Sequence, residues 1–249
     1  MLIKIQNALA RIVLSLSLSL SLYLAIYSYP SVAENNLIRL ATQNKAPFQY
    51  LGPNGEMTGL AVKRVICALK GMEQEFEIAM MPWKDAQNLT ANGEYDGFFV
   101  GSRNEDRDTF AVASDKIITG TLALIMRPTT KNFNSADPDN KEKYRYGAVF
   151  ATNKWRSLRK SGYKMVRKPR NTNDLFGMLK NTDLDVVLEY ISVYEDYVSQ
   201  NGFSSSMFTT IPHKSNDMGM YFSKKFINTR PNFMTAFNGT LAVCREKIK

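Results

Sequence analysis

The residue types that most often carry catalysis or bind metals are scarce in this chain. Its 249 residues include one histidine, His213, and two cysteines, Cys67 and Cys244. A single histidine excludes most zinc sites and every site that needs several histidines. A nucleophile–histidine pair has only His213 to use, and the sequence shows no serine or cysteine partner for it. We therefore interpret His213 as a structural residue and expect no metal site.

A strongly basic segment spans residues 154–170 (KWRSLRKSGYKMVRKPR), with eight basic residues and no acidic one. The whole chain carries 32 Lys and Arg against 23 Asp and Glu, a net charge of +9. Such a segment is typical either of a surface that binds an anionic partner or of the solvated face of ordinary helices and strands. It contains no recognisable nucleic-acid motif, and the export signal described next makes an encounter with nucleic acid rare. We favour the solvated face and expect no nucleic-acid partner.

The first 33 residues have the pattern of a secretory signal peptide. Lys4 and Arg11 are the only charged residues before Glu34, and an apolar segment with interleaved serines follows them at 12–26. Residues 31–33 (SVA) then match the small-residue pattern of a cleavage site. A permanent membrane anchor is the alternative, but the apolar stretch is short and rich in serine for a membrane span. We expect cleavage after residue 33 and a soluble mature protein.

The elements that must position any site are read from the spacing of apolar residues after residue 33. Turn residues such as the Gly-Pro-Asn-Gly segment at 52–55 separate the elements. We expect strands at 37–41, 76–81, 96–100, 121–126, 146–150, 165–166, 184–188 and 218–222. We expect helices at 62–72, 82–93, 154–160, 172–179, 192–200 and 232–246. Such alternation of strands and helices is typical of a layered α/β fold.

Four segments then follow one another in an order that is similar to one known family. The first two are 46–50 (APFQY) and 54–60 (NGEMTGL), the third is Trp83 and Leu89 with 93–97 (GEYDG), and the fourth is 101–107 (GSRNEDR) followed by Ser114. They resemble the motifs P-F-x-Y…N-G-x-x-x-G, W…L…G-x-x-D and S-x-T-x-x-R…F-S. These motifs occur in the family 3 extracellular solute-binding proteins, the polar amino-acid receptors of ABC transporters.

The resemblance covers essentially the whole chain after the signal segment and implies a type II periplasmic binding protein. That is an α/β fold with two lobes, joined by two hinge strands, and a ligand cleft between the lobes. It implies a signal peptide at 1–33, lobe one at 34–125 and 217–249, and lobe two at 126–216. It also implies a periplasmic protein that binds a small molecule without a cofactor and delivers it to an inner-membrane ABC permease. We expect a monomer.

The resemblance assigns three residues to the ligand's acidic group and its carbon chain. Arg107 would hold a carboxylate, because a guanidinium group donates two parallel charge-assisted hydrogen bonds. Ser102 would donate its hydroxyl or its backbone N–H to the same carboxylate. Trp83 would form an aromatic wall against an aliphatic stem or a cation. The plainer interpretations are a surface arginine and a core tryptophan.

Weaker assignments follow for four more residues. Phe48 and Tyr50 would line the cleft from lobe one, or simply pack within their own loop. Thr152 and Asn153 follow an expected strand of lobe two and would offer small polar contacts to the ligand.

The sequence departs from the family where the ammonium group of an amino acid would bind. The family has an aspartate five residues after the one that closes a strand segment, and counting from Asp185 places Tyr190 there. Glu189 is adjacent, but neighbouring residues of a strand point to opposite faces, so it substitutes only if the strand has ended. Lys45 replaces the tyrosine usual before the P-F motif. We keep Glu189 and Tyr190 as ligand-binding candidates, and a carboxylate ligand fits better than an α-amino acid.

Three functions are compatible with this pattern. The leading hypothesis is a non-enzymatic receptor for a small polar or carboxylated, amino-acid-like solute. The second is an enzyme on the same scaffold, because cyclohexadienyl dehydratases resemble these receptors. Such an enzyme needs an acid to protonate a leaving hydroxyl group, and Glu189 is the candidate. The third is a receptor that signals to a membrane sensor.

Both cysteines fall in lobe one of the implied fold. Cys67 lies opposite the apolar stripe of the first expected helix, whereas Cys244 lies on the stripe of the last. An oxidising compartment permits a disulfide. The sequence leaves a disulfide and two free thiols both open.

Overall fold

The computed structural model describes residues 37–130 and 133–249. The expected signal peptide at 1–33 lies outside these residues. No helix of the described ranges is long and apolar enough to cross a membrane.

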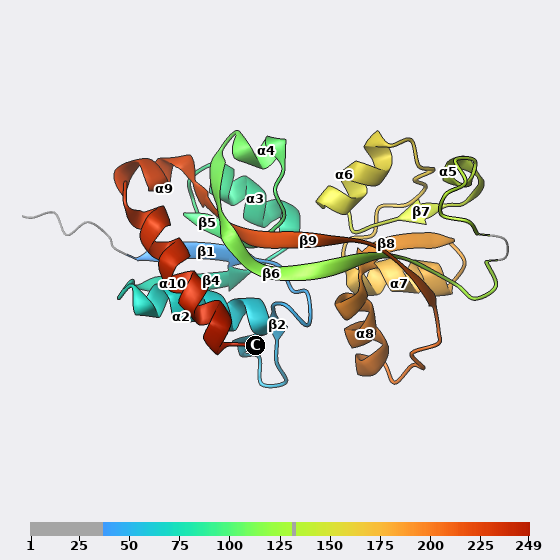
Figure 1. Cartoon of the computed structure of the whole chain (residues 1–249), viewed down its shortest axis with the longest axis horizontal. Coiled ribbons are helices and arrows are strands. Elements are labelled where there is room, and N and C mark those ends of the chain that lie inside the picture. The colour runs from blue at the N-terminus through green and yellow to red at the C-terminus, as the bar shows by residue number, and fades with distance from the viewer. Residues whose placement is uncertain (1–36, 131–132) are drawn as a thin grey trace, which may run out of the picture. The chain divides into compact units, whose positions relative to one another are not determined.

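One mixed sheet of seven strands runs through the described part of the chain (Figure 1). Its strands, in sheet order, are β4 (Phe76–Met80), β1 (Ile38–Thr42), β5 (Gly97–Gly101), β9 (Thr209–Ser223), β6 (Ala111–Met126), β8 (Val186–Tyr190) and β7 (Tyr146–Gly147). β1 is parallel to β4 and β5, and β7 is parallel to β8, whereas β6 and β9 are antiparallel to their neighbours. A small second sheet pairs β2 (Tyr50–Leu51) with β3 (Met57–Thr58).

The first group of elements packs on both faces of β1, β4 and β5. It includes α2 (Leu60–Gly71), α3 (Trp83–Ala91), α4 (Glu105–Asp108), α9 (Lys224–Thr229) and α10 (Phe233–Lys247). Successive side chains of a strand point to opposite faces, so Phe98 and Phe99 of β5 belong to different cores. Phe99 joins the large core with α2 and α10, and Phe98 joins a smaller core with Trp83 of α3.

The second group consists of β7 and β8 with α5 (Asn140–Lys143), α6 (Asn153–Lys160), α7 (Thr172–Lys180) and α8 (Ile191–Gln200). Side-chain caps explain where two of these helices begin. Thr152 accepts a hydrogen bond from the backbone N–H of Trp155, and Asn171 accepts one from that of Asp174. Phe176 of α7 packs against tyrosines of α8 and closes the core of this group.

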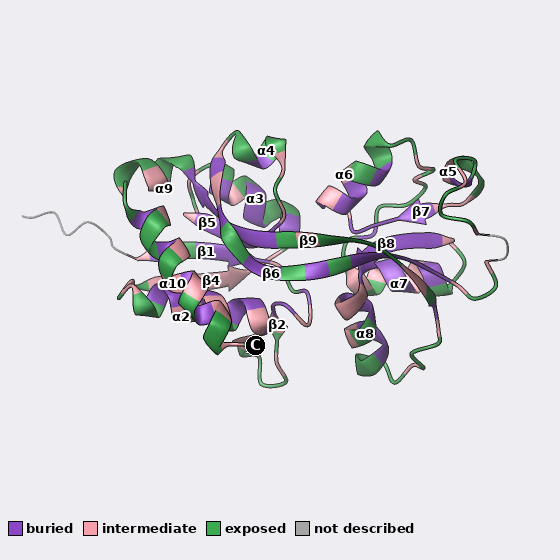
Figure 2. Cartoon of the chain, in the orientation of Figure 1, coloured by how far each residue is buried: buried purple, intermediate pink, exposed green. Residues whose placement is uncertain are grey.

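The long strands β6 and β9 run from the first group to the second (Figure 1). They pair with each other from Ala111↔Ser223 to Met126↔Thr209. Figure 2 shows how the exposure changes along β9, which is mostly exposed in its first half and buried from Met218 onwards. The expected lobe boundary at 125/126 falls at the end of β6, and the one at 216/217 falls inside β9.

The observed elements confirm most of the expected ones and correct four expected strands. The strand expected at 146–150 covers only Tyr146–Gly147, because residues 148–152 turn into α6 and Ala151 has a positive φ of 62°. Residues 165–166 form no strand, since Met165 makes only an isolated bridge to Tyr146. The strands expected at 121–126 and 218–222 are parts of the much longer β6 and β9.

A disulfide joins Cys67 of α2 to Cys244 of α10, with an S–S distance of 2.01 Å. The two helices pack side by side, as Figure 1 shows. Cys67 lies off the fully buried stripe of α2 because it faces α10 instead of the sheet. The bond decides the question that the sequence left open.

Candidate functional site

A cavity of about 170 Å³ lies where the first group, the second group and the two long strands meet. The first group contributes the loop after β1, the start of α3, the end of β5 and α4, and the second group contributes the start of α6 and the end of β8. The lining residues are Gln43, Lys45, Trp83, Val100, Ser102, Arg103, Arg107, Leu122, Thr152, Asn153, Lys154, Ser157, Leu188, Tyr190, His213, Lys214, Asn216 and Met218.

Six of the nine residues singled out from the sequence line this cavity: Trp83, Ser102, Arg107, Thr152, Asn153 and Tyr190. Three do not. Phe48 is buried behind the wall, with its ring edge-on to that of Tyr190 at 5.7 Å. Tyr50 lies in β2, away from the lining. Glu189 is fully buried in β8, and its carboxylate is bound by two lysines that line the cavity in its place.

Arg107 is buried on the short helix α4, which begins where Asn104 accepts a hydrogen bond from the backbone N–H of Arg107. Its Nε donates to Oε1 of Gln87 at 2.9 Å, and its Nη1 donates to the carbonyl oxygen of Ser102 at 2.7 Å. Burial lowers the pKa of this guanidinium group to about 10. Within the described ranges, its Nη2 has no hydrogen-bond partner and no carboxylate lies within ion-pair distance. The group therefore retains a donor and an unbalanced charge.

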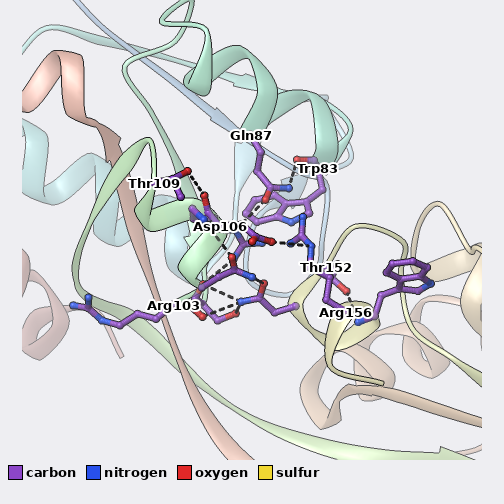
Figure 3. Close-up of polar contacts among 12 residues, drawn as sticks. Trp83, Gln87, Arg103, Asp106, Thr109, Thr152 and Arg156 are labelled. Atoms are coloured by element: carbon purple, nitrogen blue, oxygen red, sulfur yellow. Dashed lines mark hydrogen bonds and ion pairs between the residues drawn. The ribbon is translucent and has the colours of Figure 1, made fainter. Parts of the chain in front are cut away.

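Aromatic rings hold Arg107 in place. Its Cζ lies 5.1 Å from the centre of the Trp83 ring and 5.9 Å from those of Phe98 and Tyr221. Trp83 opens α3 and packs edge-on against Phe98, and Gln87 lies one helical turn further along. Figure 3 shows Trp83 and Gln87 together, whereas the side chain of Arg103 extends away from them. This arrangement orients the guanidinium group of Arg107.

Asn153 connects the second group to the first across the cavity. Its Nδ2 donates to the hydroxyl oxygen of Ser102 at 2.7 Å and to the carbonyl oxygens of Ser102 and Arg103 at 3.1 Å. Its Oδ1 accepts a hydrogen bond of 2.6 Å from Asn104. Ser102, the hydroxyl group expected to meet a ligand, is thus bonded to a residue of the opposite group.

Two lysines that the sequence did not mark as site residues also line the cavity. Lys45 of the first group donates to Oε1 of Glu189 at 3.0 Å, and Lys154 of α6 donates to the same oxygen. Burial lowers the pKa of Lys154 to about 7, although the carboxylate beside it acts in the opposite direction. Burial by itself raises the pKa of Glu189, but the two ammonium groups lower it more, so the carboxyl group is ionised.

The sequence drew attention to both lysines but did not identify them as site residues. Lys45 stood out only as a departure from the family motif. Lys154 belonged to the basic segment that we interpreted as a solvated face, yet it is buried, and its partner Glu189 lies 35 residues away in sequence. His213, which we interpreted from the sequence as a structural residue, is exposed and lines the cavity.

The charged residues that line the cavity are all basic: Lys45, Arg103, Arg107, Lys154 and Lys214. No aspartate or glutamate is among the described lining residues. Nor do the described residues contain a group of three His, Cys, Asp or Glu side chains that would hold a metal ion. The geometry offers hydrogen-bond donors and positive charge, and it is suited to binding an anion.

Solved structures resemble this fold closely over most of its length. An ancestral arginine-binding protein bound to arginine superposes with a TM-score of 0.70, at 19% identity, over 85% of this chain and 93% of its own. The arginine-, lysine-, histidine-binding protein ArtJ from the thermophilic bacterium Geobacillus stearothermophilus gives a TM-score of 0.70, 19% identity, and 84% and 90% coverage. The chain has the two-lobed fold of these amino-acid binding proteins.

In this fold the first and second groups are the two lobes, and the cavity lies between them. A third structure of the same fold is the ancestral amino acid-binding protein AncCDT-1, a precursor of cyclohexadienyl dehydratase, with a TM-score of 0.70, 15% identity, and 85% and 90% coverage. No protein-family model and no curated protein sequence matches the chain. The fold that the sequence motifs implied is confirmed, at identities that carry no ligand from one protein to another.

Proposed function

We propose that this protein is a periplasmic solute-binding protein that captures a small carboxylated solute between its two lobes. The observation that supports this best is the state of Arg107. Its guanidinium group is buried at the cavity, lacks a carboxylate partner among the described residues and keeps one nitrogen without a hydrogen bond. A buried charge without a partner is costly, so a site of this kind is stabilised when an anion enters it.

The residues around Arg107 fit the same role. Ser102 and Asn153 bring a hydroxyl and an amide to the cavity from opposite lobes, and Thr152 caps the helix that carries Asn153. A carboxylate that reached Arg107 would compete for these donors. Trp83 covers the other face of the guanidinium group. Closure of the lobes on a solute is the motion that paired hinge strands such as β6 and β9 permit.

Delivery to an inner-membrane ABC permease is the use we propose for the captured solute, with the protein acting as a monomer. The export pattern of the first 33 residues supports a periplasmic location. A membrane sensor is an equally compatible receiver of the same bound state.

The second candidate is a dehydratase on this scaffold, and the precursor of cyclohexadienyl dehydratase among the similar structures favours it. The state of Glu189 argues against its part in that reaction. A general acid must be protonated and within reach of the leaving group. Glu189 is ionised between two lysines and does not line the cavity. We therefore favour binding without turnover.

Thermal unfolding of the purified protein with amino acids and small carboxylic acids tests the proposal. A ligand present at a hundred times its Kd raises the free energy of unfolding by about 2.7 kcal/mol. For an acid found in this way, Arg107→Lys should weaken binding by about ten- to a hundredfold, because a point charge does not reproduce two parallel hydrogen bonds. Arg39→Lys is the matched control, since Arg39 is exposed on β1 and does not line the cavity.

The proposal fails if no acid or amino acid stabilises the protein, or if Arg107→Lys binds the acid as tightly as the parent does. Turnover of a cyclohexadienyl substrate by the purified protein would instead support the dehydratase.

A further inference from the structure

Three buried charged groups meet next to the cavity and do not balance. Lys45 comes from the first lobe, and Lys154 and Glu189 come from the second. Their exposed fractions are 6%, 6% and 0%. Both ammonium groups and the backbone N–H of Tyr190 donate to the same carboxylate oxygen, Oε1 of Glu189. We call these three side chains the lysine cluster.

When both lysines are protonated, the lysine cluster carries one positive charge in excess, because two lysines share one carboxylate. Arg107 adds a second positive charge without a carboxylate partner in the described ranges. A buried ion without a counter-ion costs several kcal/mol, so both excess charges call for anions. Lys45, Lys154 and Arg107 all line the same cavity, and no acidic residue among the described ones lines it. A ligand with two negative charges would therefore balance both excess charges.

The aromatic side chains of the cavity also favour an anionic ligand over a cationic one. The ring of Tyr190 lies beneath both lysines, with centroid distances of 5.1 Å to Nζ of Lys45 and 4.7 Å to Nζ of Lys154. Aromatic faces are the groups most able to hold an incoming cation where carboxylates are absent. Here the rings of Tyr190 and Trp83 already face cations of the protein itself. An ammonium or guanidinium group of a ligand would find neither a carboxylate nor a free aromatic face.

We propose, on the basis of the proposed function, that the solute is a small dianion without an ammonium or guanidinium group. One acidic group binds Arg107 beside Ser102, and the second binds Lys45 and Lys154. Glu189 holds the two lysines in place when the solute is absent. A short dicarboxylic acid has this chemistry. A small phosphorylated acid also has two acidic groups, and its phosphate group adds up to one further negative charge.

The size of the cavity limits the carbon chain. A cavity of about 150 Å³ holds a molecule the size of benzene. The 170 Å³ available here suits a compact acid of somewhat larger size, such as a dicarboxylate of four or five carbons. Arginine, the ligand of the similar arginine-binding protein, carries a guanidinium group, which this cavity would repel.

The experiment is isothermal titration of the purified protein with six ligands: succinate, glutarate, butyrate, glutamate, arginine and phosphoglycolate. Succinate or glutarate should bind at least about tenfold more tightly than butyrate, which has one acidic group, and than glutamate, which adds an ammonium group. Arginine should not bind measurably. If phosphoglycolate binds most tightly, the dianion is supported and its second acidic group is a phosphate.

Lys154→Met separates the two binding subsites. It should weaken dicarboxylate binding by about ten- to a hundredfold and leave butyrate binding within about threefold of the parent. The variant retains the ion pair of Lys45 with Glu189. Lys160→Met, an exposed residue of the same helix, is the matched control. If Lys154→Met does not fold, Lys45→Met makes the same test from the other lobe.

The outcomes distinguish this inference from the function on which it rests. Tighter binding of arginine or glutamate than of any dianion overturns the inference and leaves the solute-binding function intact. Equal binding of succinate, glutarate and butyrate overturns it as well, and so does an unchanged dicarboxylate affinity in Lys154→Met. Binding of none of the six ligands would count against the solute-binding function and the inference together.

Discussion

Removing the negative charge of Glu189 should destabilise the protein strongly. Glu189→Gln keeps the shape of the side chain but leaves Lys45 and Lys154 buried with no carboxylate between them. Breaking a buried ion pair from one side costs about 3–5 kcal/mol. Lys154 limits the loss, because its pKa of about 7 lets it release its proton at a small cost. We therefore expect Glu189→Gln to lower the free energy of unfolding by about 3 kcal/mol at pH 6.

The same substitution should cost less at high pH. The pKa of Lys154 lies below that of an unfolded lysine, so between pH 7 and about pH 10 the unfolded chain binds a proton that the folded chain has released. This makes the parent more stable as the pH rises through that window. At pH 9 Lys154 is neutral in both the parent and Glu189→Gln. Only the pairing of Lys45 with the carboxylate still distinguishes them there.

Urea unfolding followed by tryptophan fluorescence at pH 6 and pH 9 measures both quantities. Glu195→Gln is the control, because Glu195 is exposed on α8 and its substitution should change the free energy of unfolding by less than about 0.5 kcal/mol. A loss below about 1 kcal/mol at pH 6 would refute the reasoning. An equal loss at pH 6 and pH 9 would refute the part assigned to Lys154.

Three other changes have expected outcomes. Replacing Cys67 and Cys244 together by serine should lower the free energy of unfolding by about 3–5 kcal/mol, and the denatured, unreduced parent should show no free thiol on titration. Binding of a dicarboxylate at pH 8 should take up to about one proton, because an anion beside Lys154 raises its pKa from about 7; titrations in buffers of different ionisation enthalpy measure this. Gly120→Ala should weaken ligand binding and cost about 1–3 kcal/mol in urea unfolding, since its Cβ would lie 2.7 Å from the ring of Tyr190.

Local patterns were sufficient to predict the six longer helices and the buried strands of this fold, but not the short helices α4, α5 and α9. The apolar stripe of α2 and the continuous apolar run of β5 each follow from a few neighbouring residues. The full length of β6 and β9 was not predictable in this way. Residues 111–120 and 209–217 mix polar and apolar side chains. They are strands because 111–120 pairs with 216–223 of β9 and 209–217 pairs with 119–126 of β6, across about a hundred residues of chain.

The site residues also differ in whether local sequence patterns could predict them. Arg107, Ser102 and Trp83 belong to motifs that keep their spacing, so the sequence brought them together. The lysine cluster depends on contacts between residues separated by 144 and 35 positions, and no local spacing marks a buried lysine inside a basic segment. The sequence marked Glu189 and Tyr190 as candidates, but the two lysines that bind the carboxylate and pack on the ring of Tyr190 came only from the fold.

The position of β9 in the sheet affects when the protein can fold during its synthesis. β9 comes last in sequence among the strands of the described residues, yet it lies between β5 and β6. Until residues 209–223 have emerged, the edge of β5 that faces β9 has no partner, and such open edges pair readily with other chains. The bond between Cys67 and Cys244 spans 177 residues and forms later still. The sheet of the first lobe is thus completed only after residues 209–223 have been made, so this lobe cannot reach its final fold while the second lobe is still being synthesised.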